Sequence, residues 1–244
     1  MIPNNPIFAD LSTYSPDKSI AFYEKVFDWG FIKEYDYYTA YLNDEPIVGL
    51  YETPDKFKQM RMPHFWMTYI QVQSVAKTVE KARALGGIIE LTQETASLGK
   101  VALIRDPQGS GFTIYEGKAL WNTRTHNTPN TLIWNELHVS NINNVLPFYS
   151  GIFDWKIKIN QQNISRVFNS NNEHIADILE IRNELKGKYE YWILSFGVKE
   201  LVATKKKILE SGGTLVFDEG NRILFTDDSG QAFFYITEIK SMNN

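Results

Sequence analysis

Short apolar segments separated by polar turns follow a regular order along the first half of the chain. Residues 8–13 predict a strand, and apolar side chains at helical spacing then predict a helix from Pro16 to about Trp29, with Ser15 as its N-cap. Three more strands are expected, at residues 31–35, 37–42 and 47–52. The result is a βαβββ module.

The same order returns directly afterwards. A strand is predicted at residues 65–72, and Ser74 is placed to cap a helix that stops at Gly86-Gly87. Strands follow at residues 88–91, 101–105 and 112–115, with a turn at Asp106-Pro107-Gln108-Gly109 before the last of them. In such an α+β fold helices cover one face of each sheet, and two paired modules leave a curved cleft on the other face.

Motifs of the first half recur in the second half at a common spacing. Phe22-Tyr23 returns 126 residues later as Phe148-Tyr149, whereas Asp106 of the closing turn returns only 121 residues later as Asp227. The second copy has therefore lost five residues before that turn. We predict four βαβββ modules in two domains, residues 1–117 and 132–244, joined by a polar linker at 118–131.

Composition and charge narrow the classes of function. The chain has 244 residues, a net charge of −4 and no cysteine. The mild negative charge gives no electrostatic reason for nucleic-acid binding, and the missing thiols exclude disulfides and cysteine nucleophiles. No apolar stretch has the roughly 20 residues of a membrane span, and no signal peptide is visible at the start. We expect a cytoplasmic protein, monomeric or homodimeric, with no nucleic-acid or membrane partner.

Taken in order, the motifs resemble those of a known superfamily. Phe22-Tyr23, Phe27-Asp28-Trp29, Gly86-Gly87 and the turn at Asp106 are arranged as in the vicinal oxygen chelate superfamily of glyoxalases, bleomycin-resistance proteins and extradiol dioxygenases. Trp134-Asn135-Glu136-Leu137, followed by Phe148-Tyr149, is similar to two-domain bacterial glyoxalase-like proteins. The resemblance implies tandem glyoxalase-like domains, each with a cleft.

The resemblance also implies where a metal would bind. Metal-dependent members supply four ligands per domain, typically His, Gln or Glu, and leave room for two substrate oxygens. Counted from the shared motifs, the ligand positions hold Phe8, Gly49, Met67 and Thr113 in the first copy and Trp134, Asp177, Ile193 and Phe234 in the second. Only Asp177 is a suitable ligand, so we predict neither a metal nor another cofactor at the family positions.

Alternation along the strands indicates which side chains face the clefts. Asp10 and Ser12 share one face of the first strand with Phe8, while Ala9 and Leu11 face the helix. The candidate ligand-binding residues are Asp10, Ser12, Met67, Tyr69 and Thr113 in the first cleft, and Glu136, His138 and Asp177 in the second.

The three residues of the second cleft are the best candidates for acid–base chemistry or metal binding. A carboxylate next to a histidine can tune a general base, and Glu136, His138 and Asp177 could also hold a metal in a displaced site. Alternatively, they form a hydrogen-bonded pair or a solvated patch. The tyrosines of the first module would suit a flat ligand or pack the core: Tyr35, Tyr37, Tyr38, Tyr41 and Tyr51. The other histidines are expected at the surface: His64, His126 and His174.

Three functions remain open on this basis. Our hypothesis is a glyoxalase-like protein that binds a small, partly apolar molecule in one or both clefts without the family metal. The second is an enzyme, a lyase of the lactoylglutathione-lyase kind, an isomerase or a dioxygenase, with a displaced site in the second domain. The third is a regulatory or interaction module with vestigial clefts.

Overall fold

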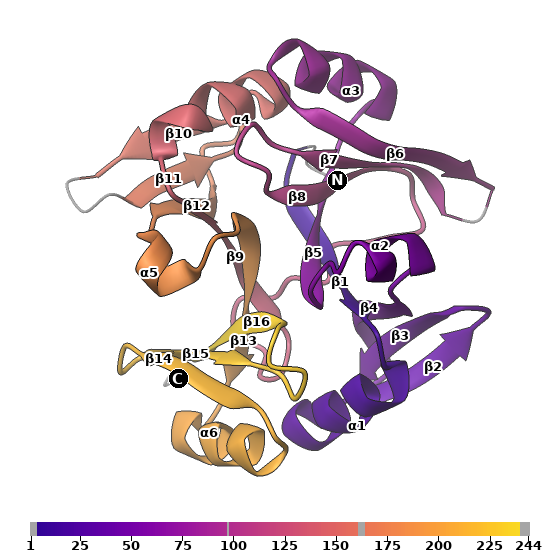
Figure 1. Cartoon of the computed structure of the whole chain (residues 1–244), viewed down its shortest axis with the longest axis vertical. Coiled ribbons are helices and arrows are strands. Elements are labelled where there is room, and N and C mark those ends of the chain that lie inside the picture. The colour runs from indigo at the N-terminus through magenta and orange to yellow at the C-terminus, as the bar shows by residue number, and fades with distance from the viewer. Residues whose placement is uncertain (1–3, 97, 161–163, 240–244) are drawn as a thin grey trace. The chain divides into compact units, whose positions relative to one another are not determined.

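The structure of the chain is a computed structural model, which describes residues 4–96, 98–160 and 164–239. Figure 1 labels its elements. The first half contains β1 (Pro6–Thr13), α1 (Pro16–Phe27), β2 (Gly30–Glu34), β3 (Tyr37–Leu42), β4 (Glu45–Glu52), α2 (Asp55–Gln59), β5 (Phe65–Gln71), α3 (Val75–Ala84), β6 (Ile88–Thr95), β7 (Gly99–Arg105) and β8 (Gly111–Glu116).

The second half repeats this order with small differences. It contains β9 (Leu132–Val139), the 3-10 helix η1 (Ile142–Asn144), α4 (Leu146–Phe153), β10 (Lys156–Ile159), β11 (Ile164–Phe168), β12 (His174–Glu180), α5 (Asn183–Lys186), β13 (Tyr191–Val198), α6 (Leu201–Glu210), β14 (Thr214–Asp218), β15 (Arg222–Thr226) and β16 (Phe233–Glu238).

Within the described residues the strands form two mixed eight-stranded sheets. Their orders are β2-β3-β4-β1-β5-β8-β7-β6 and β10-β11-β12-β9-β13-β16-β15-β14. The second order is the first with every strand number raised by eight. The predicted α+β fold of four βαβββ modules in two tandem copies is therefore confirmed.

The contacts divide the chain into two compact units, each with one module from either half. Unit 1 combines the residues up to Phe8, Thr68–Asn122 and Asn135–Ile193; unit 2 combines Ala9–Met67, Thr123–Trp134 and the residues from Leu194 onward. The domains predicted at 1–117 and 132–244 follow the repeat in the sequence, and their status as domains stays a prediction.

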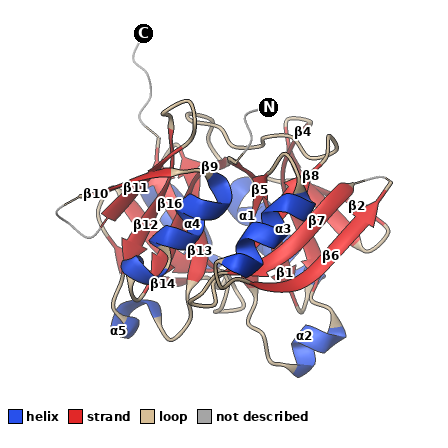
Figure 2. Cartoon of the chain, turned by 90° about the horizontal axis from the view of Figure 1, so that it is seen from above, coloured by secondary structure: helices blue, strands red, loops and turns tan. Residues whose placement is uncertain are grey.

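Each unit has a core between its sheets and helices. In unit 1, α3 packs against α4, and the two helices lie side by side in Figures 1 and 2. In unit 2, α1 packs against α6. The helix aromatics predicted to press on the sheets are at most 3% exposed: Phe22, Phe27, Phe148 and Phe153.

The repeated aromatic pair and the closing turn meet inside each unit. In unit 1 the Tyr149 hydroxyl donates to the Asp106 carboxylate at 3.0 Å, and the Trp192 indole N–H donates to the Tyr149 oxygen at 3.1 Å. In unit 2 the Tyr23 hydroxyl lies 3.5 Å from the Asp227 carboxylate. The tyrosine of one half is thus bound to the turn of the other half, which explains why both motifs recur together.

Local structure departs from the sequence prediction in four places. The Ser15 side chain makes no capping hydrogen bond to α1; its backbone N–H donates to the Thr13 hydroxyl. Ser74, by contrast, caps α3 as predicted, accepting the Lys77 N–H. β6 extends to Thr95, beyond the predicted end at Leu91. The short helices α2 and α5 lie in segments whose polar composition carries no helical periodicity.

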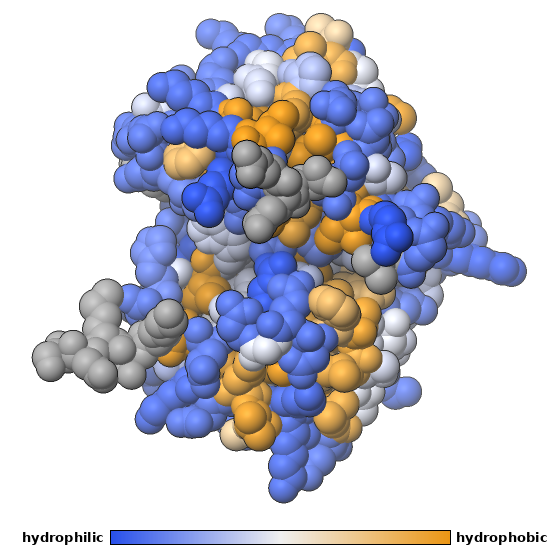
Figure 3. Space-filling view, turned by 90° about the vertical axis from the view of Figure 1, so that its left-hand side faces the viewer, coloured by the Kyte–Doolittle hydropathy of each residue, from blue (hydrophilic) through white to orange (hydrophobic). Residues whose placement is uncertain are grey.

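No helix in the described ranges is long and apolar enough to cross a membrane. On the face in Figure 3, hydrophobic areas are separated by hydrophilic side chains. The oligomeric state, monomer or homodimer, stays a prediction.

Candidate functional site

The predicted pair on β9 is buried and hydrogen-bonded. Glu136 and His138 are 5% and 1% exposed, and Nε2 of His138 lies 3.2 Å from Oε2 of Glu136. Leu137 and Val139, which alternate with them, belong to the apolar core of unit 1. The predicted strand register is therefore confirmed, and both polar side chains point away from that core.

Asp177 on β12 lies next to this pair. β12 and β9 are parallel, with Asp177 directly opposite Glu136. Cross-strand partners project to the same side of a sheet, so the three predicted residues share one face. The Asp177 carboxylate, however, is engaged with Nε2 of His174 at 2.8 Å. The face thus holds two histidine–carboxylate pairs, and its role in binding stays a prediction.

His174 was expected to be a surface residue without a role. A β-bulge explains why it nevertheless contacts Asp177. Strand partners are Val167 with Ala176 and Phe168 with His174, so Ile175 is an extra residue in β12. The bulge brings His174 and Asp177, three positions apart, onto the same face, whereas strict alternation would separate them. Bulges have no distinct sequence signature, and alternation alone could not place His174.

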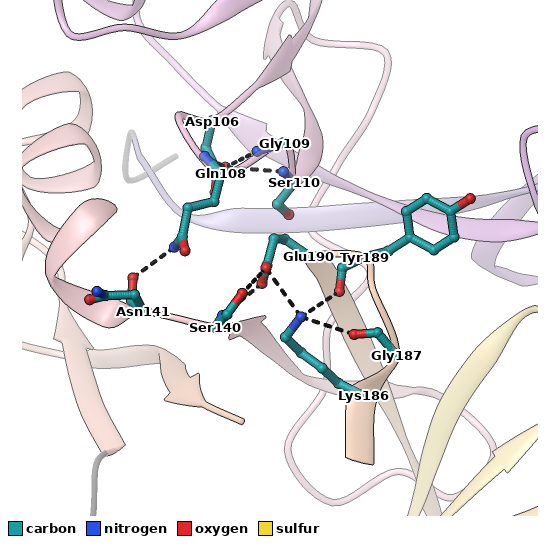
Figure 4. Close-up of polar contacts among 10 residues, drawn as sticks. All are labelled: Asp106, Gln108, Gly109, Ser110, Ser140, Asn141, Lys186, Gly187, Tyr189 and Glu190. Atoms are coloured by element: carbon teal, nitrogen blue, oxygen red, sulfur yellow. Dashed lines mark hydrogen bonds and ion pairs between the residues drawn. The ribbon is translucent and has the colours of Figure 1, made fainter. Parts of the chain in front are cut away.

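A buried lysine fixes the connection between β12 and β13 (Figure 4). The Lys186 side chain is fully buried, and its ammonium group contacts Oε1 of Glu190 at 3.1 Å and the carbonyl oxygens of Tyr189 at 2.9 Å and Gly187 at 3.3 Å. The Glu190 carboxylate in turn accepts the backbone N–H and the hydroxyl of Ser140, just after β9. We call Lys186, Glu190 and Ser140 the clasp. It ties the start of β13 to the end of β9.

Tyr191, the first residue of β13, follows the clasp directly. Its ring centroid lies 5.5 Å from that of His138. Burial, and next the charge of Glu190, raise the pKa of Tyr191 to about 12, so its hydroxyl keeps its proton at neutral pH. The clasp therefore fixes an aromatic side chain with a hydroxyl donor next to His138. Sequence reasoning missed Tyr191, since a tyrosine that starts a strand carries no distinguishing pattern.

In the first half the corresponding acid is hydrogen-bonded within its own module. Asp10, 1% exposed, accepts a hydrogen bond from the Tyr37 hydroxyl at 3.2 Å. Its strand partner is Gly49, where an added Cβ would lie 1.7 Å from the Tyr37 oxygen. Burial, then the charge of Asp10, raise the pKa values of Tyr37 and Tyr51 above their usual range. Glycine at position 49 thus makes room for a neutral phenol that pairs with Asp10.

The remaining candidates of the first half fall in different units. Ser12, in unit 2, shares a hydrogen bond of 2.9 Å with Thr53. Met67, also in unit 2, is buried. Tyr69 and Thr113 are strand partners on β5 and β8 of unit 1. The structure therefore brings Ser12 near Asp10 and Tyr69 near Thr113, and their function as ligand contacts stays a prediction.

Two expectations for side chains outside the candidate sites need correction. Tyr35 is 96% exposed, so it belongs to no tyrosine cluster. His64 is not a surface residue: it is 9% exposed, its Nδ1 lies 3.1 Å from the Thr13 hydroxyl, and its ring packs on Tyr14. The turn after α2 folds back onto the end of β1, which the sequence does not reveal. His126 is exposed as expected.

One cavity lies away from all of these residues. It has a volume of about 380 Å³ and lies in unit 2, lined by side chains that include Lys33, Tyr38, Glu52 and Lys58. Lys58 already pairs with Glu52, and the Lys33 ammonium lies 5.1 Å from the centre of the Tyr38 ring. None of the predicted site residues lines it, so it gives no support to the predicted clefts.

The residues at the family metal positions do not fit a metal. Of the eight positions, only Asp177 offers a carboxylate or imidazole, and its oxygen is engaged with His174. Zinc, manganese and iron sites need several nitrogen or oxygen ligands around one point. Among the described residues no group of three or more His, Asp or Glu side chains is placed to hold a metal ion.

Comparison with known proteins identifies the relatives of this chain. Residues 8–114 match the family described as Glyoxalase/Bleomycin resistance protein/Dioxygenase superfamily. CFP32 of Mycobacterium tuberculosis, provisionally named a glyoxylase, is 25% identical over 93% of this chain and 92% of its own length. DnrV of Streptomyces peucetius, an anthracycline biosynthesis protein, is 22% identical over 95% of this chain and 92% of its own length.

Solved structures show the same fold. The Mn(II)-bound glyoxalase from Novosphingobium aromaticivorans aligns with a TM-score of 0.65 and 12% identity, covering 98% of this chain and 83% of the other. Homoprotocatechuate 2,3-dioxygenase from Brevibacterium fuscum, in complex with 3,4-dihydroxyphenylacetate, aligns with a TM-score of 0.67 and 12% identity, covering 100% of this chain and 83% of the other. Residues 8–114 therefore match the glyoxalase/bleomycin resistance protein/dioxygenase superfamily, and over nearly its whole length the chain is similar to the relatives named above.

Proposed function

We propose that this chain binds a small, partly apolar molecule in its second half, without the family metal, at Glu136 and His138. The observation that carries the proposal is the buried Glu136–His138 hydrogen bond on the polar side of β9. Burying a carboxylate and an imidazole on a sheet face costs free energy that an apolar pair would avoid. A ligand with a hydroxyl or carbonyl group would form hydrogen bonds with that pair.

Three neighbouring groups define what such a ligand would meet. Glu136 accepts hydrogen bonds, His138 can accept or donate through its ring nitrogens, and Tyr191 offers a protonated hydroxyl and an aromatic face. Mixed apolar and hydrogen-bonding surroundings are typical of small-molecule sites. The first half is the weaker candidate, because Asp10 pairs with a phenol, whereas Glu136 pairs with an imidazole that can either donate or accept.

The test is ligand binding by protein freed of metal. Metabolites are screened by thermal shift after treatment with a chelator, since a ligand that binds only the native state raises the melting temperature. Hits are then titrated by calorimetry against wild type, His138→Ala and Glu136→Gln, with the exposed His126→Ala as the matched control. We expect affinity to fall about tenfold or more in the first two variants, the loss of one hydrogen bond to a charged group, and to stay unchanged in the third.

Two outcomes would decide against the proposal. Hits that keep their affinity in both His138→Ala and Glu136→Gln would place the ligand elsewhere. Turnover that requires an added divalent metal and is lost in Asp177→Asn would favour the alternative, an enzyme with a displaced site, because Asp177 is the family position that carries a metal-binding side chain.

A further inference from the structure

One row of charged side chains crosses the sheet of the third module in unit 1. The strand partners are Lys158 with Arg166, Arg166 with Asp177, and Asp177 with Glu136. Because direct partners project to the same side, all four side chains share the face of Glu136 and His138. The intervening partners, which include Val167 and Ala176, belong to the apolar core behind the sheet. The row thus runs from two bases at the sheet edge to two acids inside.

An aromatic surface lies beside the two bases. Phe168 is the strand partner of Lys156 on one side and of His174 on the other. The Lys158 ammonium lies 4.6 Å from the centre of the Phe168 ring, and the His174 ring lies 5.3 Å from it at an interplanar angle of 31°. Phe168 is half-buried, whereas His174 and the three basic side chains are exposed. We call Lys156, Lys158, Arg166, Phe168 and His174 the basic platform.

The three basic side chains of this platform make no direct ion pair among the described residues. In the described part of the chain no carboxylate lies within ion-pair distance of Lys156, Lys158 or Arg166. The closest acid along the row, Asp177, is engaged with His174. The chain as a whole carries a net charge of −4, so three uncompensated bases around an aromatic ring are a local exception.

We infer that the basic platform binds the anionic, aromatic end of a small ligand. A flat ring can lie against Phe168 and His174, while a carboxylate or sulfonate faces Arg166 and the lysines. Two strand spacings separate Arg166 from Glu136, about 10 Å. A planar anion of one or two fused rings is of the right size to place its far end near Glu136. This names the ligand class for the site proposed above, and in that respect it rests on the proposed function.

The experiment uses naphthalene-2-sulfonate as the probe, measured by equilibrium dialysis on the full chain. The neutral naphthalene-2-sulfonamide and the non-aromatic cyclohexanesulfonate test charge and flatness separately. The variants are Arg166→Gln, Lys158→Gln and Phe168→Leu, with Lys206→Gln as the control, an exposed lysine on α6 in unit 2. Each exposed contact with a charge or ring is expected to contribute about two- to fivefold in affinity.

We expect naphthalene-2-sulfonate to bind more tightly than either comparison compound, and less tightly as salt is raised. Arg166→Gln, Lys158→Gln and Phe168→Leu should each weaken it, while Lys206→Gln should not. Equal binding of the sulfonate and the sulfonamide, or unchanged affinity in Arg166→Gln, would overturn the inference.

His138→Ala separates this inference from the proposed function. If the platform binds the sulfonate, Arg166→Gln weakens sulfonate binding, whether or not His138→Ala loses the metabolite hits. If His138→Ala abolishes sulfonate binding while Arg166→Gln leaves it intact, the anion binds at the inner pair and the platform is wrong.

Discussion

The clasp makes a quantitative prediction about the stability of unit 1. In Lys186→Met a fully buried ammonium is replaced by an apolar side chain of similar length. The Glu190 carboxylate keeps its hydrogen bonds from Ser140 but loses the ammonium group with which it pairs, and two backbone carbonyl oxygens lose a donor. Removing one partner of a buried ion pair costs about 3 kcal/mol, because the other charge stays buried. We therefore expect unfolding to become easier by about that amount.

The assay is urea unfolding followed by circular dichroism and tryptophan fluorescence. For a chain of this size, about 3 kcal/mol corresponds to a fall in melting temperature of about 6–12 °C. Lys206→Met is the matched control: its ammonium is 75% exposed and lies 3.7 Å from Glu210. Exposed pairs contribute little, so this variant should change stability by less than about 0.5 kcal/mol.

The double variant Lys186→Met/Glu190→Gln tests the cause. Glutamine still accepts the Ser140 N–H through its amide oxygen, but leaves no buried charge behind. It should therefore recover about 1–2 kcal/mol relative to Lys186→Met. A single variant within about 0.5 kcal/mol of wild type, or a double variant no more stable than Lys186→Met, would show that the lysine is not coupled to Glu190.

Three further predictions concern other parts of the molecule. Gly49→Ala should push the Tyr37 ring off Asp10, because the new Cβ would lie 1.7 Å from the phenol oxygen, and cost about 1–3 kcal/mol in urea unfolding; an unchanged melting temperature would contradict this. Burial raises the pKa of Asp227 from an ordinary 3.8 to about 6. The protonated Asp227 therefore stabilises the fold fully below about pH 4, and this stabilisation is lost as the pH rises through about 6. Relative to Asp227→Asn, the wild-type free energy of unfolding should fall by up to about 3 kcal/mol between pH 4 and 7, and a difference that does not change with pH would refute the shift. Phe148→Ala should cost about 3–5 kcal/mol, since the ring is 1% exposed, and a loss below about 1 kcal/mol would contradict its place in the core.

Most of the fold could be predicted because it depends on period and repetition. Alternation placed Leu137 and Val139 in the core and Glu136 and His138 opposite them, and one shift related the helices of both halves. Even the glycine pair has a physical reason, since a Cβ at Gly87 would lie 2.7 Å from the Phe148 ring. Properties that repeat along a chain can be read from it directly.

The missing parts of the site depend on contacts that have no period. His174 reaches Asp177 only through the bulge at Ile175, and Tyr191 reaches His138 through a connection held by Lys186. From the sequence alone, Lys186 would be taken for an ordinary surface lysine in a polar loop. The pairing of Tyr149 with the Asp106 turn joins residues 43 positions apart, and no local pattern predicts such a contact.

The two halves of the chain differ most at one point of their common register. Asp10 faces Gly49 in the first half, and Glu136 faces Asp177 at the corresponding position of the second. In the first half a glycine admits a neutral phenol, which pairs with the single acid. In the second half two carboxylates stand directly opposite each other, an arrangement that destabilises a sheet unless other groups compensate.

Each of these carboxylates has a histidine partner, His138 for Glu136 and His174 for Asp177. An imidazole can both donate and accept hydrogen bonds through its two ring nitrogens, whereas a phenol with a raised pKa keeps its hydroxyl proton. The second half therefore keeps groups that can respond to a ligand, on the same face that carries the uncompensated bases of the platform. In the first half the corresponding acid instead pairs with the phenol of Tyr37. This difference in chemistry, rather than any difference in fold, is the reason to look for function in the second half.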